Sequence, residues 1–148
     1  MKQKLLSGFL GSVVLTAFLA PSALAASETF YWNFDMDLRA VYGDQNGQYM
    51  SFSKSGDKTV SGSIWADVKG TTPTPAKINV AAWRDTLGPD TLAGETSMQP
   101  SKTLESKTSF ELPLGIEPAD QYYLRFEKYG SSDDGWDLKG SGKFENTY

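Results

Sequence analysis

The sequence predicts an all-β protein, a single antiparallel β-sandwich that follows a cleaved signal peptide. Three observations support this prediction. Residues 1–25 have the composition of a secretion signal, residues 26–148 alternate apolar and polar side chains in short segments, and Gly, Pro, Asn and Asp cluster between those segments. Alternation with a period of two is typical of a strand with one face on a core and one in water. Roughly six to eight such segments separated by turn residues favour a sandwich.

The first 25 residues predict export. Lys2 and Lys4 precede a largely apolar run over residues 5–19, and Ala23 and Ala25 provide the small-x-small pattern that signal peptidase cleaves. The run is too short for a stable membrane anchor, which needs about 20 apolar residues. We therefore expect residues 1–25 to be a signal peptide, residues 26–148 to form one domain, and the product to be secreted and extracellular, without membrane attachment after cleavage.

The composition argues against several classes of function. The chain contains no His and no Cys, so a Ser-His-Asp triad, a Cys nucleophile, a disulfide and every His-containing metal site are impossible. The formal net charge is −4 and there is no basic run, which argues against nucleic-acid binding. An exported domain without disulfides is more typical of a bacterial protein. These properties predict a protein that is not an enzyme and needs no cofactor.

The first predicted strand covers residues 29–40. Its apolar side chains fall on even positions and are expected to face the core: Phe30, Trp32, Phe34, Met36, Leu38 and Ala40. Residues 43–47 contain two glycines and an asparagine, which supply the backbone angles of a tight turn. A short return strand is expected at residues 49–52 and a second turn at residues 55–57.

The remaining predicted strands lie at residues 59–69, 77–85, 104–112, 121–129 and 136–148. Residues 70–75 are expected to form a loop because two prolines there cannot donate to a sheet. Residues 86–101 are rich in Gly, Pro and Thr and are expected to be irregular, with a short edge strand near residues 95–98. No segment has the apolar spacing of an amphipathic helix.

A tyrosine near the start of one strand carries a family resemblance. Ile116, Pro118 and Tyr122 lead into the alternating segment 121–129, and residues 112–129 resemble the E–F corner of fibronectin type III and immunoglobulin-like domains. The resemblance implies an immunoglobulin-like sandwich in which Tyr122 is structural and its hydroxyl hydrogen-bonds to the backbone near the turn. The Cys–Trp–Cys pattern of antibody domains is absent. Such domains host many functions, so the resemblance implies none.

Four aromatic residues are the candidate ligand-binding surface: Trp83, Trp136, Tyr123 and Tyr129. Trp83 breaks the parity of its strand, since Ile78 and Val80 point to the opposite face. A large ring that is left wet on an outer face is a natural contact for a sugar or a protein partner. The alternative is that Trp83 and Trp65 are buried on both sides or shifted by bulges.

The densest acidic cluster contains Asp133, Asp134 and Asp137. Three carboxylates within five residues make a weak candidate for a calcium site. Aspartate is also common in hairpin turns, and Gly130 and Gly135 already indicate a hairpin. We therefore expect a turn and no metal.

The sequence leads to two hypotheses of function. The first is a secreted, non-catalytic β-sandwich binding module for an unidentified extracellular glycan or protein on a cell surface or in the environment. The alternative is a structural or assembly protein of the cell envelope or extracellular matrix. In that alternative the N-terminal strand would add to the sheet edge of a neighbour by β-augmentation.

Overall fold

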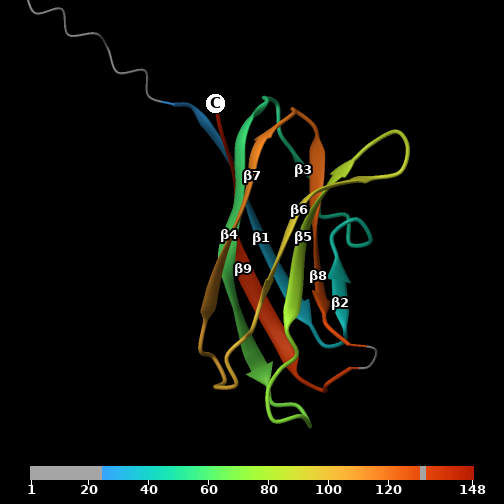
Figure 1. Cartoon of the computed structure of the whole chain (residues 1–148), viewed down its shortest axis with the longest axis vertical. Helices are drawn as coiled ribbons and strands as arrows, with labels where there is room; N and C mark the ends of the chain where they lie inside the picture. Colours follow the sequence, from blue (N-terminus) through green and yellow to red (C-terminus); the bar gives the residue numbers. More distant parts are fainter. Residues whose placement is uncertain (1–24, 131–132) are drawn as a thin grey trace, which may run out of the picture.

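The computed structural model describes residues 25–130 and 133–148 and shows two antiparallel β-sheets and no helix in these residues (Figure 1). The four-stranded sheet has the order β1 (Ser27–Met36), β9 (Asp137–Thr147), β4 (Gly56–Val68) and β7 (Thr108–Glu117). The five-stranded sheet has the order β2 (Ala40–Tyr42), β8 (Gln121–Lys128), β5 (Ile78–Asp85) and β6 (Thr91–Met98), with β3 (Met50–Ser51) also paired to β8. The predicted signal peptide, apart from Ala25, lies outside the described residues.

The core fills the space between the two sheets. The rings of Trp32 and Phe34 on β1 pack against Phe126 on β8, with centroids 5.1 Å and 4.4 Å from the Phe126 ring. These rings lie close to glycines of the neighbouring strand: a Cβ atom at Gly140 would collide with Phe34 and one at Gly142 with Trp32. The glycines of β9 therefore make room for the aromatic side chains of β1.

Three strands differ from the sequence-based expectation. The first ends at Met36, because the chain then crosses from the four-stranded sheet to β2 in the other sheet. Leu38 is in this crossing and is 70% exposed, so its predicted place on the core face is wrong. β6 is eight residues long instead of a short edge segment, and β7 begins at Thr108, so that Leu104 lies exposed in the preceding loop.

Tyr122 lies at the corner between β7 and β8. Its side chain is fully buried, and its hydroxyl donates to the carbonyl of Pro118 at 2.9 Å. Burial, with a contribution from the nearby Glu117 carboxylate, raises the pKa of Tyr122 to about 12. Tyr122 therefore makes the type of hydrogen bond that a tyrosine corner requires.

A buried lysine joins three elements beside this corner. The Lys58 ammonium is fully buried and donates to the carbonyls of Lys54 and Glu117 and to the Asn146 side chain, at 3.0–3.2 Å. It also lies 5.0 Å from the centre of the Phe52 ring. Burial lowers the pKa of Lys58 against the opposing attraction of nearby carboxylates. This network connects the turn before β4 to β7 and β9.

In the described part of the chain, no helix is long and apolar enough to span a membrane.

Candidate functional site

Trp136 does not belong to an exposed surface. Its side chain is fully buried, and its indole nitrogen donates to the carbonyl and the hydroxyl of Thr72 at 3.1 Å and 3.0 Å. The physical reason is the loop at residues 70–75, which folds over the ring and provides these acceptors. The assignment of Trp136 to a ligand-binding face is therefore corrected: it is a core residue.

Tyr123 is also buried, although it points away from the main core. Its hydroxyl donates to Asp90 at 2.6 Å, and the Tyr49 ring packs edge-on against it at 5.9 Å. Two excursions of the chain thus cover this outer face of the five-stranded sheet: the segment between β2 and β3 and the β5–β6 hairpin. Tyr123 is removed from the candidate binding surface for this reason.

Trp83 lies on the same outer face and is partly buried. The Arg125 guanidinium lies 4.9 Å from the Trp83 ring and 5.2 Å from the rings of Tyr42 and Tyr123. Asp44 accepts from Arg125 at 3.1 Å. The indole N–H of Trp83 is buried and has no hydrogen-bond partner among the described residues. Trp83 is therefore mainly part of a small second core around Arg125.

Two further aromatic residues keep some exposure without forming a platform. Tyr129 is 54% exposed at the end of β8, and the Lys77 ammonium lies 5.7 Å from its ring centre. Trp65 lies on the outer face of β4 with Lys107 4.6 Å above its ring. Because Trp136 and Tyr123 are buried and Arg125 packs on Trp83, the structure does not bring the four predicted contact residues together into one exposed surface.

The acidic loop surrounds a lysine. The buried Lys128 ammonium lies 2.8 Å from Asp134 and 3.2 Å from Asp133. Burial opposes ionisation of Asp134, but hydrogen bonds from Lys128 and from the N–H groups of Ala76 and Trp136 outweigh it and hold the pKa of Asp134 below its ordinary value. Among the described residues, no group of three or more His, Cys, Asp or Glu could hold a metal ion. Asp137, the third candidate, begins β9.

The outer edge of β1 is unpaired among the described residues. Ala26 and Tyr148 exchange both of their backbone hydrogen bonds, and the β1–β9 register continues from there without a shift to Met36. Such doubly bonded pairs recur at every second residue in an antiparallel ladder. The even residues of β1 therefore bond to β9, and the odd ones direct their N–H and C=O groups outward: Ser27, Thr29, Tyr31, Asn33 and Asp35.

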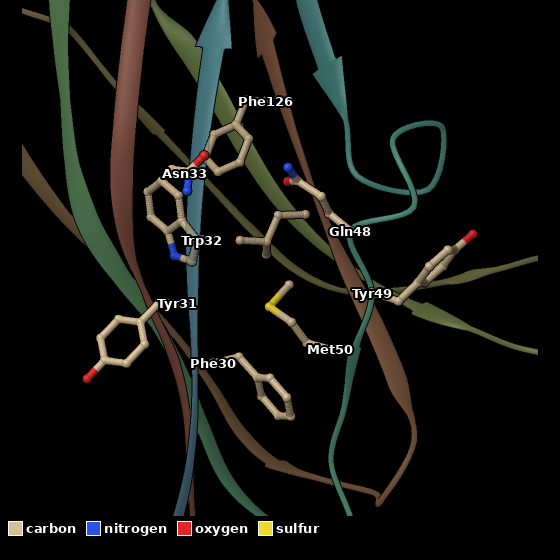
Figure 2. Close-up of a pocket in the computed structure, with 9 residues that line it drawn as sticks. Phe30, Tyr31, Trp32, Asn33, Gln48, Tyr49, Met50 and Phe126 are labelled. Atoms are coloured by element: carbon tan, nitrogen blue, oxygen red, sulfur yellow. The ribbon is translucent and has the colours of Figure 1, made fainter.

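A hollow of about 230 Å³ opens between this edge and the segment before β3 (Figure 2). We call it the inter-sheet slot. Its apolar lining consists of Phe30, Trp32, Met50, Leu124 and Phe126. Its remaining lining residues lie on β1 and on the segment that leads into β3: Tyr31, Asn33, Gln48 and Tyr49. In Figure 2 the Tyr31 ring points away from the slot, on the other face of β1, where it is 84% exposed.

The slot and the unpaired edge of β1 beside it together form one candidate site. The edge offers regularly spaced backbone donors and acceptors, and the slot offers apolar surface next to them. Trp32 is 6% exposed, and its indole N–H has no hydrogen-bond partner among the described residues. Chemically, this arrangement can bind an extended chain but supplies no nucleophile or paired acid and base.

Sequence reasoning predicted the N-terminal strand and, as an alternative hypothesis, its addition to a neighbour's sheet, but it did not predict the slot beside the edge. The even-position alternation of residues 30–36 identified the core-facing side chains of β1. Which strand lies at the edge of a sheet depends on long-range pairing, and the alternation of apolar and polar residues does not reveal it. The absence of Lys, Arg and Pro from residues 25–38 was a signal that could have found the edge.

Comparisons with known proteins do not assign a family. No family model matches the chain, and no curated protein matches it. Among solved structures, a chain from Desmodium yellow mottle tymovirus is 10% identical over 99% of this chain and 94% of that chain, with a TM-score of 0.30. A chain from turnip yellow mosaic virus is 10% identical over 92% of this chain and 87% of that chain, with a TM-score of 0.31. Similarity at this level supports no conclusion about function.

Proposed function

We propose that the protein is a secreted, non-catalytic binding module that captures an extended segment of a partner polypeptide on the free edge of β1. The observation that supports this most is the row of outward-directed N–H and C=O groups at alternate residues from Ser27 to Asp35. A polypeptide strand is the ligand whose own donors and acceptors repeat with the same spacing. The inter-sheet slot beside the edge then receives a side chain of that strand.

The edge lacks several of the devices by which natural sheets protect an edge strand, although it carries the carboxylates of Glu28 and Asp35. Exposed edge strands are usually short or interrupted by Pro, Lys or a bulge, since an open edge recruits other chains. β1 has ten residues, contains none of these residues, and pairs with β9 without a register shift. An unprotected edge of this length supports a role in strand addition.

A glycan has less support as the ligand. An aromatic platform for sugar rings would need two or more exposed rings on one face, whereas Trp136 is buried and Arg125 packs on Trp83. The proposal therefore takes a protein partner and keeps the module non-catalytic, because the chain has neither His nor Cys for the commonest catalytic roles.

The substitution Asn33→Pro tests this function. The Asn33 N–H points away from β9, so proline removes no hydrogen bond within the protein but places its ring where a partner carbonyl would dock. A random library of peptides of about ten residues, displayed on phage, is selected against the wild-type protein. Selected peptides should lose at least about tenfold in affinity for Asn33→Pro, which corresponds to about two backbone hydrogen bonds.

Asn33→Ser is the matched control, because it changes the same side chain and keeps the N–H. It should bind the selected peptides as the wild type does, and thermal melting should show that both variants fold. Equal affinity of the peptides for Asn33→Pro and Asn33→Ser, or a selection that yields no binder, would count against capture at β1.

A further inference from the structure

We infer that the segment captured at β1 is basic, with a large apolar side chain in the inter-sheet slot and a Lys or Arg three residues away on the opposite face. This inference rests on the proposed function, because it specifies the ligand of the same edge. It follows from the position of the slot, from the charges along β1 and from the register between them.

The slot determines the apolar side chain. Side chains of a strand added to β1 alternate between the two faces of the sheet, so those beside the even residues of β1 face inward, over the slot. The slot measures about 230 Å³, and an enclosed apolar cavity of about 150 Å³ is already large enough for benzene. One Phe, Leu or Met side chain therefore fits beside Trp32. Met50 in the wall is unbranched and can adapt to the shape of the guest.

The charges of β1 determine the basic residue. Residues 25–38 contain Glu28, Asp35 and Asp37 and no Lys or Arg. Glu28 accepts hydrogen bonds from Ser53 and is thereby engaged within the protein. The Asp35 side chain is 64% exposed.

Asp35 keeps capacity for a further cation. The Lys139 ammonium lies 2.7 Å from Asp67 but 3.8 Å from Asp35, so Lys139 is held mainly by Asp67. Asp35 therefore offers a largely exposed carboxylate to a chain that pairs with β1, and its ion-pair partner Lys139 lies 3.8 Å away and is shared with Asp67. A Lys or Arg of the captured segment is the complementary group.

The register sets the spacing between the two features. Trp32 faces the slot, and Asp35 follows three residues later on the opposite face of β1. Three residues along a strand span about 10 Å and always end on the other face. The captured segment therefore carries its basic residue three positions before the apolar one when it pairs antiparallel, and three positions after it when it pairs parallel.

A second copy of this chain is a poorer occupant of the same edge. Its own β1 would bring the same carboxylates and no basic residue between positions 25 and 38. Carboxylates that face each other across paired strands are destabilising. Charge complementarity thus favours a basic segment from another protein.

The peptides selected against the wild-type protein test the inference directly. They should share a large apolar residue and a Lys or Arg at a distance of three positions. For a synthetic peptide of this pattern, replacing the apolar residue by Ser should weaken binding more than about tenfold. Replacing the basic residue by Glu should weaken it about two- to fivefold, as expected for an exposed ion pair.

A charge exchange provides the matched control. The variant Asp35→Lys should bind the Lys-containing peptide more weakly and should recover binding of the peptide that carries Glu at that position. Selected peptides without the pattern, or a Glu peptide that Asp35→Lys does not rescue, would overturn the inference.

The failure of the inference and the failure of the proposed function are distinguishable. Selected peptides that lack the apolar and basic residues at this spacing could still lose their binding to Asn33→Pro. That result would support capture at β1 and would contradict the inferred sequence of the captured segment. If the peptides bind Asn33→Pro unchanged, the proposed function itself fails. A concentration-dependent dimer in sedimentation that Asn33→Pro converts to a monomer would show that a second copy occupies the edge, which also overturns the basic ligand.

Discussion

At the residue scale, the Tyr122 hydroxyl stabilises the β7–β8 corner. Tyr122→Phe removes the hydrogen bond from the buried Tyr122 hydroxyl to the Pro118 carbonyl. We expect a loss of about 1 kcal/mol in the free energy of unfolding, measured by urea denaturation. Tyr49→Phe is the control, because the Tyr49 hydroxyl makes only a 3.4 Å contact at the surface. Equal denaturation midpoints for the two variants would show that the corner hydrogen bond contributes nothing.

The pair of Lys128 and Asp134 makes stability depend on pH. Because the folded-state pKa of Asp134 is below its ordinary value, its ionisation stabilises the fold above the unfolded-state pKa, and this contribution is lost as the pH falls through the folded-state pKa. Asp134→Asn removes the closer of the two carboxylates at the buried Lys128 ammonium and leaves the more exposed Asp133 as its ion-pair partner. It should cost up to about 3 kcal/mol near neutral pH.

The same variant distinguishes an ion pair from a steric effect. The difference in unfolding free energy between wild type and Asp134→Asn should shrink in acid, where the wild-type carboxyl is itself protonated. Denaturation curves at neutral pH and below the folded-state pKa of Asp134 measure this. A difference that does not change with pH would mean that packing or the backbone hydrogen bonds, and not the charge, stabilise the loop.

At the scale of elements, β9 is shaped to receive the aromatic side chains of β1. Gly142→Ala adds a methyl group that meets the Trp32 ring and the backbone of β4. We expect a loss of about 1–3 kcal/mol from overpacking, visible as a lower melting temperature. Gly88→Ala is the control, because an added Cβ there meets nothing within 4 Å. Equal melting temperatures for the two variants would show that the packing of the Trp32 ring does not require glycine at position 142.

At the scale of the whole molecule, the alternation of apolar and polar residues was sufficient to predict the fold class. It was not sufficient to predict which aromatic side chains are exposed at the surface. Periods of two residues are properties of each strand, so residues 30–36, 78–82 and 122–126 revealed their core faces from the sequence. Trp136 and Tyr123 were misplaced because segments distant in the chain cover them: the loop at residues 70–75 and the β5–β6 hairpin. Covering of this kind leaves no local sequence pattern.

The edge position of β1 could not be read from the alternation of its residues for a related reason. Strand order arises from long-range pairing, in which β9 at the end of the chain inserts between β1 and β4. This arrangement leaves the odd residues of β1 without backbone partners among the described residues and opens the slot toward Gln48. The alternative hypothesis from the sequence had the N-terminal strand add to the sheet of a neighbour. The strand order identifies the edge of β1 at which the proposed pairing would occur.

Amide hydrogen exchange along β1 tests capture of a strand most directly. In the free protein the amides of Tyr31 and Asn33 should exchange fast, while those of Trp32 and Phe34, bonded to β9, should exchange slowly. Adding a selected peptide should slow the odd amides by about tenfold or more and leave the even ones unchanged. Odd amides that are already protected in the free protein, or that the bound peptide does not slow, would contradict strand addition at this edge.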